Sequence, residues 1–376
     1  MQFRDVIGQE EIKHRLVNAY HEGRVSHAQL FVGPEGNGNL ALALAYAQFI
    51  NCPNKTQDDS CGSCPSCRKY SNLVHPDLHF VFPIVNKKKE GTVSDHFITE
   101  WRKINADKHS YFGFNDWLEY MDAEDKQGSI QKSESSEIIR KLNLKVFEAE
   151  YKTMVIWMIE KMNETCANKI LKVLEEPPPN TLFLMIAENT EVMLATILSR
   201  SQMIKIPRID TATLSEYIAK EFSMGKEEAM ALAANANGSV VKSRELYQLS
   251  ETLALFFDNF MFLMRKSYTR DVKSLVDWAN GIDKWGREKQ KSFLEYCLQM
   301  IRNNFILNIK TNELVHISKA EMDFSVKFSP FITEFVAFQF TDLLNEAHYH
   351  IERNGKARII FLDTALKFSI IFSKKQ

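Results

Sequence analysis

The sequence predicts an α/β protein in which a parallel, helix-covered sheet is followed by helical domains. Up to about residue 206, short apolar runs that suit buried strands alternate with segments of helical apolar spacing. A glycine-rich turn joins the first strand to the helix that follows it. From about residue 210 onward the helical spacing continues and the strand signals fade, so the C-terminal part is expected to be helical.

The elements of the α/β part follow from local composition. We expect buried strands over residues 28–32, 78–82, 153–159, 181–187 and 203–206. We expect helices over residues 5–24, 40–49, 135–142 and 164–176. The last of these helices ends before Pro177, because proline cannot donate the backbone hydrogen bond that would continue it.

A chain of 376 residues is too long for one ordinary core, so several domains are expected. We expect an α/β domain over residues 1–208, a small helical domain over 209–247 and a helical bundle over 250–376. Within the first domain, residues 50–70 form a cysteine-rich module. Residues 84–130 form an insertion of weak periodicity, whose role the sequence leaves open.

The composition limits the class of protein. About 45% of the residues are apolar and 25% are charged, which is typical of a soluble globular protein. We expect a cytoplasmic protein, because no apolar run approaches the roughly 20 residues of a membrane helix and the charged N-terminal segment lacks a signal-peptide core. The formal net charge of -1 gives no support for tight nucleic-acid binding by the chain alone.

The turn from Gly33 to Leu40 reads GPEGNGNL and follows the spacing of a phosphate-binding loop, GxxxxGK[ST]. Gly33 and Gly38 stand where the motif needs its glycines, after a strand and before a helix. Asn39 replaces the lysine that holds the phosphates, and Leu40 replaces the hydroxyl residue that holds Mg²⁺. We therefore expect a loop that keeps the backbone form and has no functional ATP site.

A second expected loss lies at the end of the third strand. A hydrolysing site of this kind needs an acid pair directly after the strand, and the sequence has Trp157 and Met158 there. Glu160 is the only acid close by. Two independent losses at one site argue against an ATPase.

Cys52, Cys61, Cys64 and Cys67 have the spacing C-x8-C-x2-C-x2-C, which lets four thiolates converge on one tetrahedral ion. Such a soft ligand set most often selects Zn²⁺, and the absence of an open position predicts a structural metal. Disulfides and scattered buried thiols are the alternatives, and an iron–sulfur cluster is a weaker one. A reducing cytoplasm disfavours disulfides, and the close spacing of the four cysteines disfavours separate buried thiols.

These motifs occur together in one known family. The matching segments are Phe3, Ile7–Glu10, His27–Phe31, the loop and cysteines above, His75–Asp77, Asn168–Pro178 and Ser199–Gln202. With them the chain resembles the delta-prime subunits of the bacterial DNA polymerase III clamp loader, which are AAA+ proteins. Ser201 departs from the family's Ser-Arg-Cys motif.

The resemblance implies a non-hydrolysing member of a pentameric ring that loads a sliding clamp onto primed DNA. It implies DnaX-type tau/gamma subunits and a delta subunit as partners in a hetero-oligomer, with residues 209–247 as a lid and residues 250–376 as a collar. It also implies that Arg200 is an arginine finger acting in trans on a neighbour's ATP. Without the family, a surface or salt-bridged role for this arginine is favoured.

Two other functions remain open at this point. One is an active ATPase subunit of the same family, against which Asn39, Leu40, Trp157 and Met158 weigh. The other is a separate zinc-ribbon protein that binds nucleic acid, which the cysteines alone permit. The neutral net charge and the position of the cysteines inside an α/β domain weigh against it.

Overall fold

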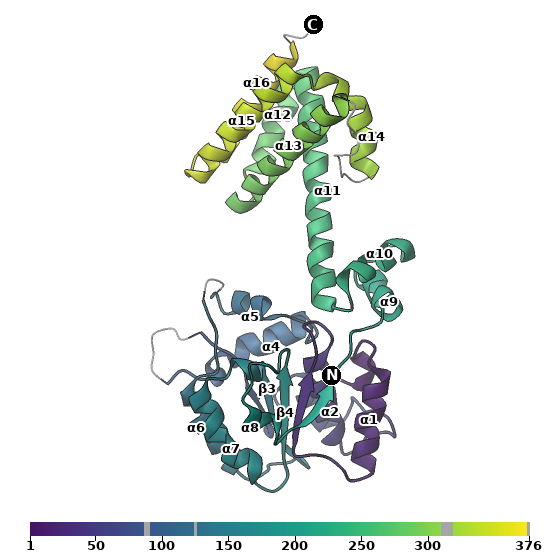
Figure 1. Cartoon of the computed structure of the whole chain (residues 1–376), viewed down its shortest axis with the longest axis vertical. Helices are drawn as coiled ribbons and strands as arrows, with labels where there is room; N and C mark the ends of the chain where they lie inside the picture. The colour runs from purple at the N-terminus through teal and green to yellow at the C-terminus, as the bar shows by residue number, and fades with distance from the viewer. Residues whose placement is uncertain (86–90, 124–125, 310–318, 374–376) are drawn as a thin grey trace. The chain divides into compact units, whose positions relative to one another are not determined.

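A computed structural model describes residues 1–85, 91–123, 126–309 and 319–373 (Figure 1). The chain forms two compact units, Met1–Tyr247 and Gln248–Gln376, and the boundary falls within helix α11 (Val240–Thr269). The finer division into three domains stays a prediction. Within the described ranges, no helix is both long enough and apolar enough to cross a membrane.

The first unit is built on a parallel five-stranded sheet in the order β2-β3-β4-β1-β5. The strands are β1 (Ala28–Val32), β2 (Leu78–Val81), β3 (Lys152–Trp157), β4 (Thr181–Ala187) and β5 (Gln202–Lys205). Every residue of β3 and β4 is buried, as continuous apolar runs in a sheet covered on both faces require. The predicted helix-covered parallel sheet is therefore confirmed.

Helices cover both faces of this sheet. Outside the insertion, the helices of the first unit are α1 (Glu10–His21), α2 (Asn39–Ile50), α3 (Pro65–Ser71), α6 (Lys132–Asn143), α7 (Glu164–Glu175), α8 (Ala195–Leu198), α9 (Thr211–Glu221) and α10 (Lys226–Ala236), with short 3₁₀ helices η1 (Phe3–Asp5) and η3 (Ile159–Lys161). α9 and α10 pack against each other. Alternate strand residues enter different cores: Phe31 and Leu184 pack on the α2 side, whereas Leu30 and Met185 pack on the side of α6 and α7.

The predicted insertion is part of the main core. It contains η2 (Ser94–Phe97), α4 (Ile98–Asp107) and α5 (Phe114–Tyr120), while residues 86–90 and 124–125 lie outside the described residues. Trp101 and Trp117 are fully buried, and the ring of Trp101 stacks on Phe82 with centroids 4.3 Å apart. Trp101 also lies 5.3 Å from Trp157 at the end of β3, so the insertion packs directly on the sheet.

The second unit is a helical bundle around an aromatic core. Besides the C-terminal part of α11 it contains α12 (Val272–Ile282), α13 (Arg287–Asn308), α14 (Lys319–Phe328), η5 (Ser329–Phe331), α15 (Glu334–Glu352) and α16 (Ala357–Ser373). α13 packs against α15, and α12 packs against α16. Phe260, Phe293, Phe340 and Phe368 are fully buried among these helices.

Candidate functional site

The glycine-rich turn lies between β1 and α2, as the motif requires. Gly36 and Gly38 have positive φ angles of 79° and 92°, which L-residues with side chains rarely adopt. α2 begins directly afterwards at Asn39. The backbone therefore keeps the strand–turn–helix arrangement of a phosphate-binding loop.

Asn39 turns back onto the loop itself. Its side chain is buried, and Nδ2 donates a hydrogen bond to the carbonyl of Gly33 over 2.6 Å. A phosphate-binding lysine would instead extend away from the loop with a free positive charge. Asn39 thus closes the loop with a neutral bond and offers no charge to an anion.

Two further segments of the same unit cover the loop. Gly38 lies against Tyr111, since a Cβ added to this glycine would come within 2.8 Å of the phenolic oxygen. Gly36 lies against the start of α11, where its carbonyl accepts a 3.1 Å hydrogen bond from the N–H of Val240. A Cβ on Gly36 would also collide with Ser239 Oγ. The loop is therefore covered by parts of its own chain.

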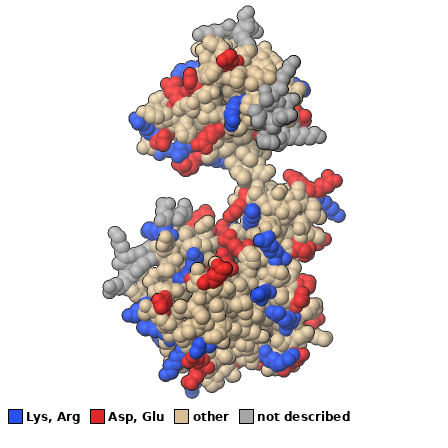
Figure 2. Space-filling model, viewed as in Figure 1, with Lys and Arg blue, Asp and Glu red and all other residues tan. Residues whose placement is uncertain are grey.

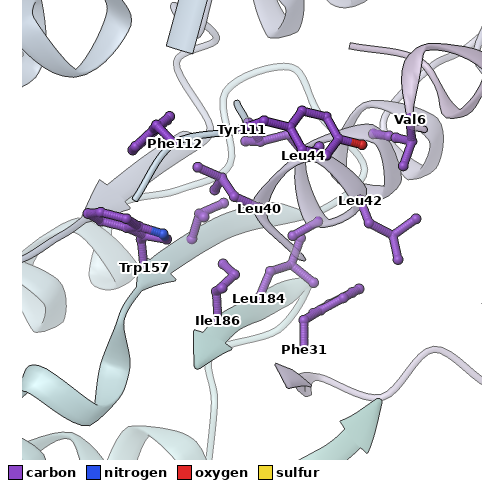
Figure 3. Close-up of a cluster of buried hydrophobic side chains, with 14 of the residues drawn as sticks. Val6, Phe31, Leu40, Leu42, Leu44, Tyr111, Phe112, Trp157, Leu184 and Ile186 are labelled. Carbon is purple, nitrogen blue, oxygen red and sulfur yellow. The ribbon is translucent and has the colours of Figure 1, made fainter. Parts of the chain in front are cut away.

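Leu40 covers the loop on the side that faces the sheet. Figure 3 shows it in a buried apolar cluster with Phe112, Trp157 and Ile186. The space left between the loop and these residues measures about 20 Å³. A single water needs roughly 10–15 Å³ measured in this way, so the cavity has room for about one water.

Three carboxyl groups lie at the same end of the sheet. The pKa of Glu35 is raised by burial, and its carboxylate also receives the backbone N–H of Phe114 at the start of α5. Glu160 follows β3 and accepts a 2.9 Å hydrogen bond from the N–H of Glu188. Burial, with the nearby Glu35 and Glu160 charges, raises the pKa of Glu188 to about 7. These acids lie beside Lys161, whose charge opposes the rise in the pKa of Glu160 and of Glu188.

The four predicted cysteine ligands come together in the structure. Their sulfur atoms all lie within 4.8 Å of one another, with Cys52 3.6 Å from Cys61 and 4.0 Å from Cys64. A tetrahedron with Zn–S bonds of about 2.3 Å has edges of about 3.8 Å. All four cysteines are free of disulfides. This cluster can hold a metal ion.

Backbone donors point at these sulfur atoms, which suits thiolate ligands. The N–H groups of Cys61, Cys64 and Cys67 each lie 3.4 Å from the sulfur of the preceding cysteine in the set. Donation from the N–H groups of Cys64 and Ser63 lowers the pKa of Cys61 to about 6. Burial raises the pKa of Cys52 and of Cys67, because it disfavours the charged thiolates. A bound cation would offset this cost of burying the thiolates.

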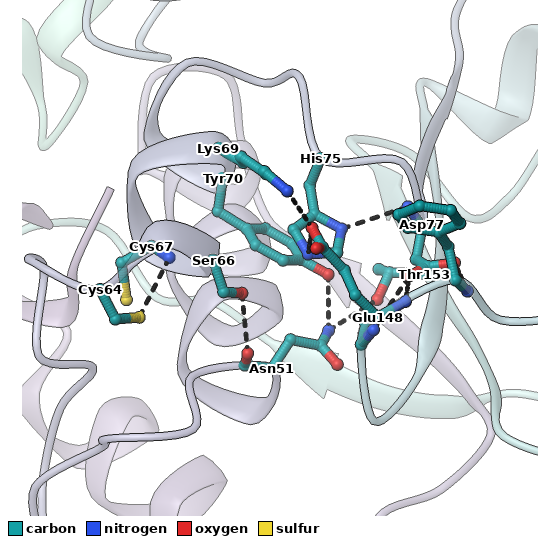
Figure 4. A network of polar contacts seen from close by, with 12 residues as sticks. Asn51, Cys64, Ser66, Cys67, Lys69, Tyr70, His75, Asp77, Glu148 and Thr153 are labelled. Carbon is teal, nitrogen blue, oxygen red and sulfur yellow. Dashed lines mark hydrogen bonds and ion pairs between the residues drawn. The ribbon is translucent and has the colours of Figure 1, made fainter.

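A polar network connects the cysteine module to the sheet (Figure 4). Asn51, next to Cys52, donates to Tyr70 Oη over 2.7 Å and accepts from the N–H of Tyr151 over 2.8 Å. The carboxylate of Asp77 accepts hydrogen bonds from three successive N–H groups, those of residues 147–149. Although burial alone would raise it, these bonds lower the pKa of Asp77. The His75–Asp77 motif is thus a structural support of the loop before β3.

Arg200 follows α8 and precedes β5, and it is paired within its own chain. Its Nε donates to Glu175 Oε1 over 2.6 Å, and Nη2 donates to the same oxygen. Its Nη1 donates to the carbonyl of Thr196 over 2.9 Å and to Ser199 Oγ over 3.2 Å. The Arg200 side chain keeps 32% of its surface exposed.

Sequence reasoning placed the loop, the cysteines and Arg200 but missed their neighbours. Tyr111 covers the loop from within the insertion, whose weak periodicity gave no indication of this contact. Glu175 stands in the quoted Asn168–Pro178 segment, yet nothing in the sequence pairs it with Arg200. The loop precedes the N-terminal end of α2, and the cysteine cluster begins just after its C-terminal end.

Comparisons with known proteins agree with these motifs. A family model described as DNA polymerase III, delta subunit, matches residues 8–210, which is more than half of the chain. The delta′ subunit of Haemophilus influenzae is 29% identical over 268 residues, covering 71% of this chain and 69% of that protein. The delta′ subunit of Bacillus subtilis is 26% identical over 243 residues, covering 65% and 60%.

Subunits of the tau type are also similar. The tau subunit of Bacillus subtilis is 22% identical over 382 residues, covering 96% of this chain and 60% of tau, so the chain spans only part of that relative's length. A solved structure of a gamma-subunit-related protein of Thermotoga maritima is 12% identical and covers 96% of this chain and 99% of that one. Its TM-score of 0.35 is too low to support an argument. Because the family model spans more than half of it, the chain belongs to the DNA polymerase III delta-subunit family and is a subunit of the clamp-loader type.

Proposed function

We propose that this chain is a delta-prime-type clamp-loader subunit that neither binds nor hydrolyses ATP productively. The closed loop is the observation that carries the proposal. Asn39 bonds to Gly33, Tyr111 lies on Gly38, and the remaining space of about 20 Å³ is far too small for a triphosphate. A nucleotide would have to displace core side chains to enter.

Electrostatics support the same proposal. Phosphoryl transfer depends on positive charge around the phosphates, supplied by a lysine and Mg²⁺. Here the loop carries Asn39, and the carboxyl groups of Glu35, Glu160 and Glu188 lie at its end of the sheet. When ionised, these carboxylates repel a polyphosphate, and when protonated they offer it no positive charge.

Arg200 is proposed as the positive contribution of this subunit to ATP hydrolysis. It would act in trans on ATP bound to a neighbouring DnaX-type tau/gamma subunit, in a complex that also contains a delta subunit. The complex would load a sliding clamp onto primed DNA. The Ser199–Gln202 motif and the partly exposed guanidinium support this role. The ion pair with Glu175 is equally expected of an arginine with a purely structural role, so it does not support the trans-acting role.

The cysteine cluster is proposed to bind structural Zn²⁺. Four thiolates at tetrahedral spacing, three of them buried, leave no position for a reacting ligand. The ion would hold the turn from Cys52 to Cys67 against α2 and, through Asn51, against the sheet. We assign it no step in catalysis.

An active ATPase subunit is the alternative that the tau-type relatives bring forward. It predicts ATP hydrolysis by the purified chain, whereas the closed loop predicts none above background. A nucleic-acid-binding zinc protein is the other alternative. On the face of the first unit shown in Figure 2, basic and acidic side chains are interspersed, which does not favour it.

The proposal is tested by reconstitution with tau/gamma and delta subunits. Arg200→Ala should lower the DNA- and clamp-stimulated ATPase, because an arginine finger is worth about 10³–10⁵ in rate at the site it serves. Lys205→Ala is the matched control, since Lys205 is an exposed cation on the adjacent strand β5. An unchanged rate for Arg200→Ala would exclude the trans-acting role.

A further inference from the structure

Nearly all hydrogen-bond donors of Arg200 are used within its own chain. Nε and Nη2 donate to Glu175 Oε1, and Nη1 donates to both Thr196 O and Ser199 Oγ. A guanidinium carries five N–H donors. Four are therefore in use, and one remains for any other acceptor. In this arrangement the arginine cannot donate two hydrogen bonds to one phosphate group.

Rigid neighbours fix the position of Glu175. It is the last residue of α7, and Pro177 follows shortly after it. The carbonyl of the preceding residue, Leu174, accepts a 2.9 Å hydrogen bond from His27 Nε2, which ties this end of α7 to the start of β1. The backbone of Glu175 therefore stands at a defined place, from which the carboxylate reaches Arg200.

Helix formation itself gives no reason for an acid at this position. The C-terminal end of a helix carries partial negative charge, so a cation there is favourable and a carboxylate is unfavourable. The guanidinium of Arg200 supplies the compensating charge, 25 residues along the chain. The placement of Glu175 is thus explained by Arg200 rather than by α7.

We propose that Glu175 is a positioning residue for Arg200. Its carboxylate holds the guanidinium against its own subunit, which we call the parked state, until a phosphate chain on a neighbouring subunit replaces Glu175 as the acceptor. This inference rests on the proposed trans-acting role of Arg200. Glu175 touches no nucleotide in this scheme. It determines the fraction of time for which the guanidinium is free to bind a neighbour's phosphates before the complex has bound DNA and clamp.

The contact is suited to exchange rather than to permanent stability. Arg200 and Glu175 keep 32% and 47% of their side-chain surface exposed, and both guanidinium bonds go to one carboxylate oxygen. The stronger bidentate form would use both oxygens in parallel. An exposed pair of this kind shifts an equilibrium by no more than about five-fold. A phosphate chain offers more oxygen acceptors and more charge.

The test compares four complexes reconstituted with tau/gamma and delta subunits: wild type, Glu175→Gln, Arg200→Ala and the double variant. Glu175→Gln removes the charge and keeps the shape, so the unstimulated ATPase should rise about two- to five-fold. The fully stimulated rate should stay within about two-fold of wild type, and the double variant should match Arg200→Ala. Glu176→Gln, an exposed acid at the next position, is the control.

A second measurement needs only the isolated chain. The Nε–H resonance of Arg200, assigned through Arg200→Lys, should show slowed hydrogen exchange in wild type and in Glu176→Gln. It should exchange faster in Glu175→Gln, because a neutral amide oxygen accepts a weaker hydrogen bond than a carboxylate. The midpoint of thermal unfolding should be the same in all these variants, because an exposed pair adds little stability.

The outcomes separate the two proposals. If Arg200→Ala lowers the stimulated rate while Glu175→Gln leaves the unstimulated rate unchanged or lowers it, the parking role is wrong and the trans-acting role stands. If Arg200→Ala leaves the rate unchanged, both are wrong. If the Nε–H exchange does not respond to Glu175→Gln, the contact itself is absent in solution and the parking role is overturned.

Discussion

The hydroxyl of Tyr111 accepts a 2.9 Å hydrogen bond from the backbone N–H of Ile7, 104 residues earlier in the sequence. The carbonyl of Tyr111 accepts a further bond from Arg244 Nη1 over 2.7 Å. Its ring lies against Gly38. One residue of the insertion therefore joins the N-terminal segment, the glycine loop and helix α11.

Substitution of Tyr111 should measure how much these contacts contribute to the free energy of unfolding of the first unit. Tyr111→Phe removes a partly buried hydrogen bond and leaves the Ile7 N–H without its acceptor, at a cost of about 1 kcal/mol. Tyr111→Ala also leaves a cavity and should cost about 3–5 kcal/mol. Urea unfolding followed by tryptophan fluorescence checks both values. Equal stability of all three proteins would contradict the contact.

Restoring the two motif residues should not restore an ATPase. In Asn39→Lys/Leu40→Thr, the lysine replaces a buried side chain, and the threonine enters a cluster with Trp157 and Phe112. We expect lower stability, no binding of a fluorescent ATP analogue at submillimolar concentration, and no hydrolysis, because the space for phosphates remains closed. Tight binding or turnover would show that only the two side chains had been missing.

Metal content should follow the cysteines. The purified chain should carry on the order of one Zn²⁺, and Cys64→Ser should reduce that content sharply, since one of four ligands is lost. Ser63→Ala, at an exposed neighbouring position, keeps all four thiols and should keep the metal. Elemental analysis after dialysis checks the stoichiometry. Full metal content in Cys64→Ser would exclude a four-cysteine site.

The raised pKa of Glu188 predicts a pH-dependent stability. Its pKa is about 7 in the folded protein against an ordinary value of 4.5, so the folded state loses free energy of unfolding as pH rises from about 4.5 to 7. Glu188→Gln removes this loss. Its advantage over wild type should be small below pH 4.5 and reach up to about 3 kcal/mol above pH 7.

Denaturant titrations at several pH values check this dependence on Glu188. Glu191→Gln, three residues away and exposed, is the control and should leave the pH profile unchanged. A difference between Glu188→Gln and wild type that stays constant from pH 4.5 to 8 would contradict the raised pKa of Glu188.

Local sequence was sufficient for the elements and for the cysteine cluster. Strand β4 and the second half of β3 are continuous apolar runs, and Pro177 limits α7, so periodicity and composition located them. The turns between Cys61, Cys64 and Cys67 are short, and their geometry is determined within a few residues. The missing lysine at Asn39 is likewise readable from the motif alone.

The sequence by itself determined the fold class, the convergence of the four cysteines and the loss of the two phosphate-binding side chains, because each depends on neighbours along the chain. Only the tertiary structure decided what lies against the glycine loop and what holds Arg200. Tyr111 reaches Gly38, and Glu175 reaches Arg200, across separate elements. Such contacts depend on how the helices pack on the sheet, and no local pattern of apolar spacing records them.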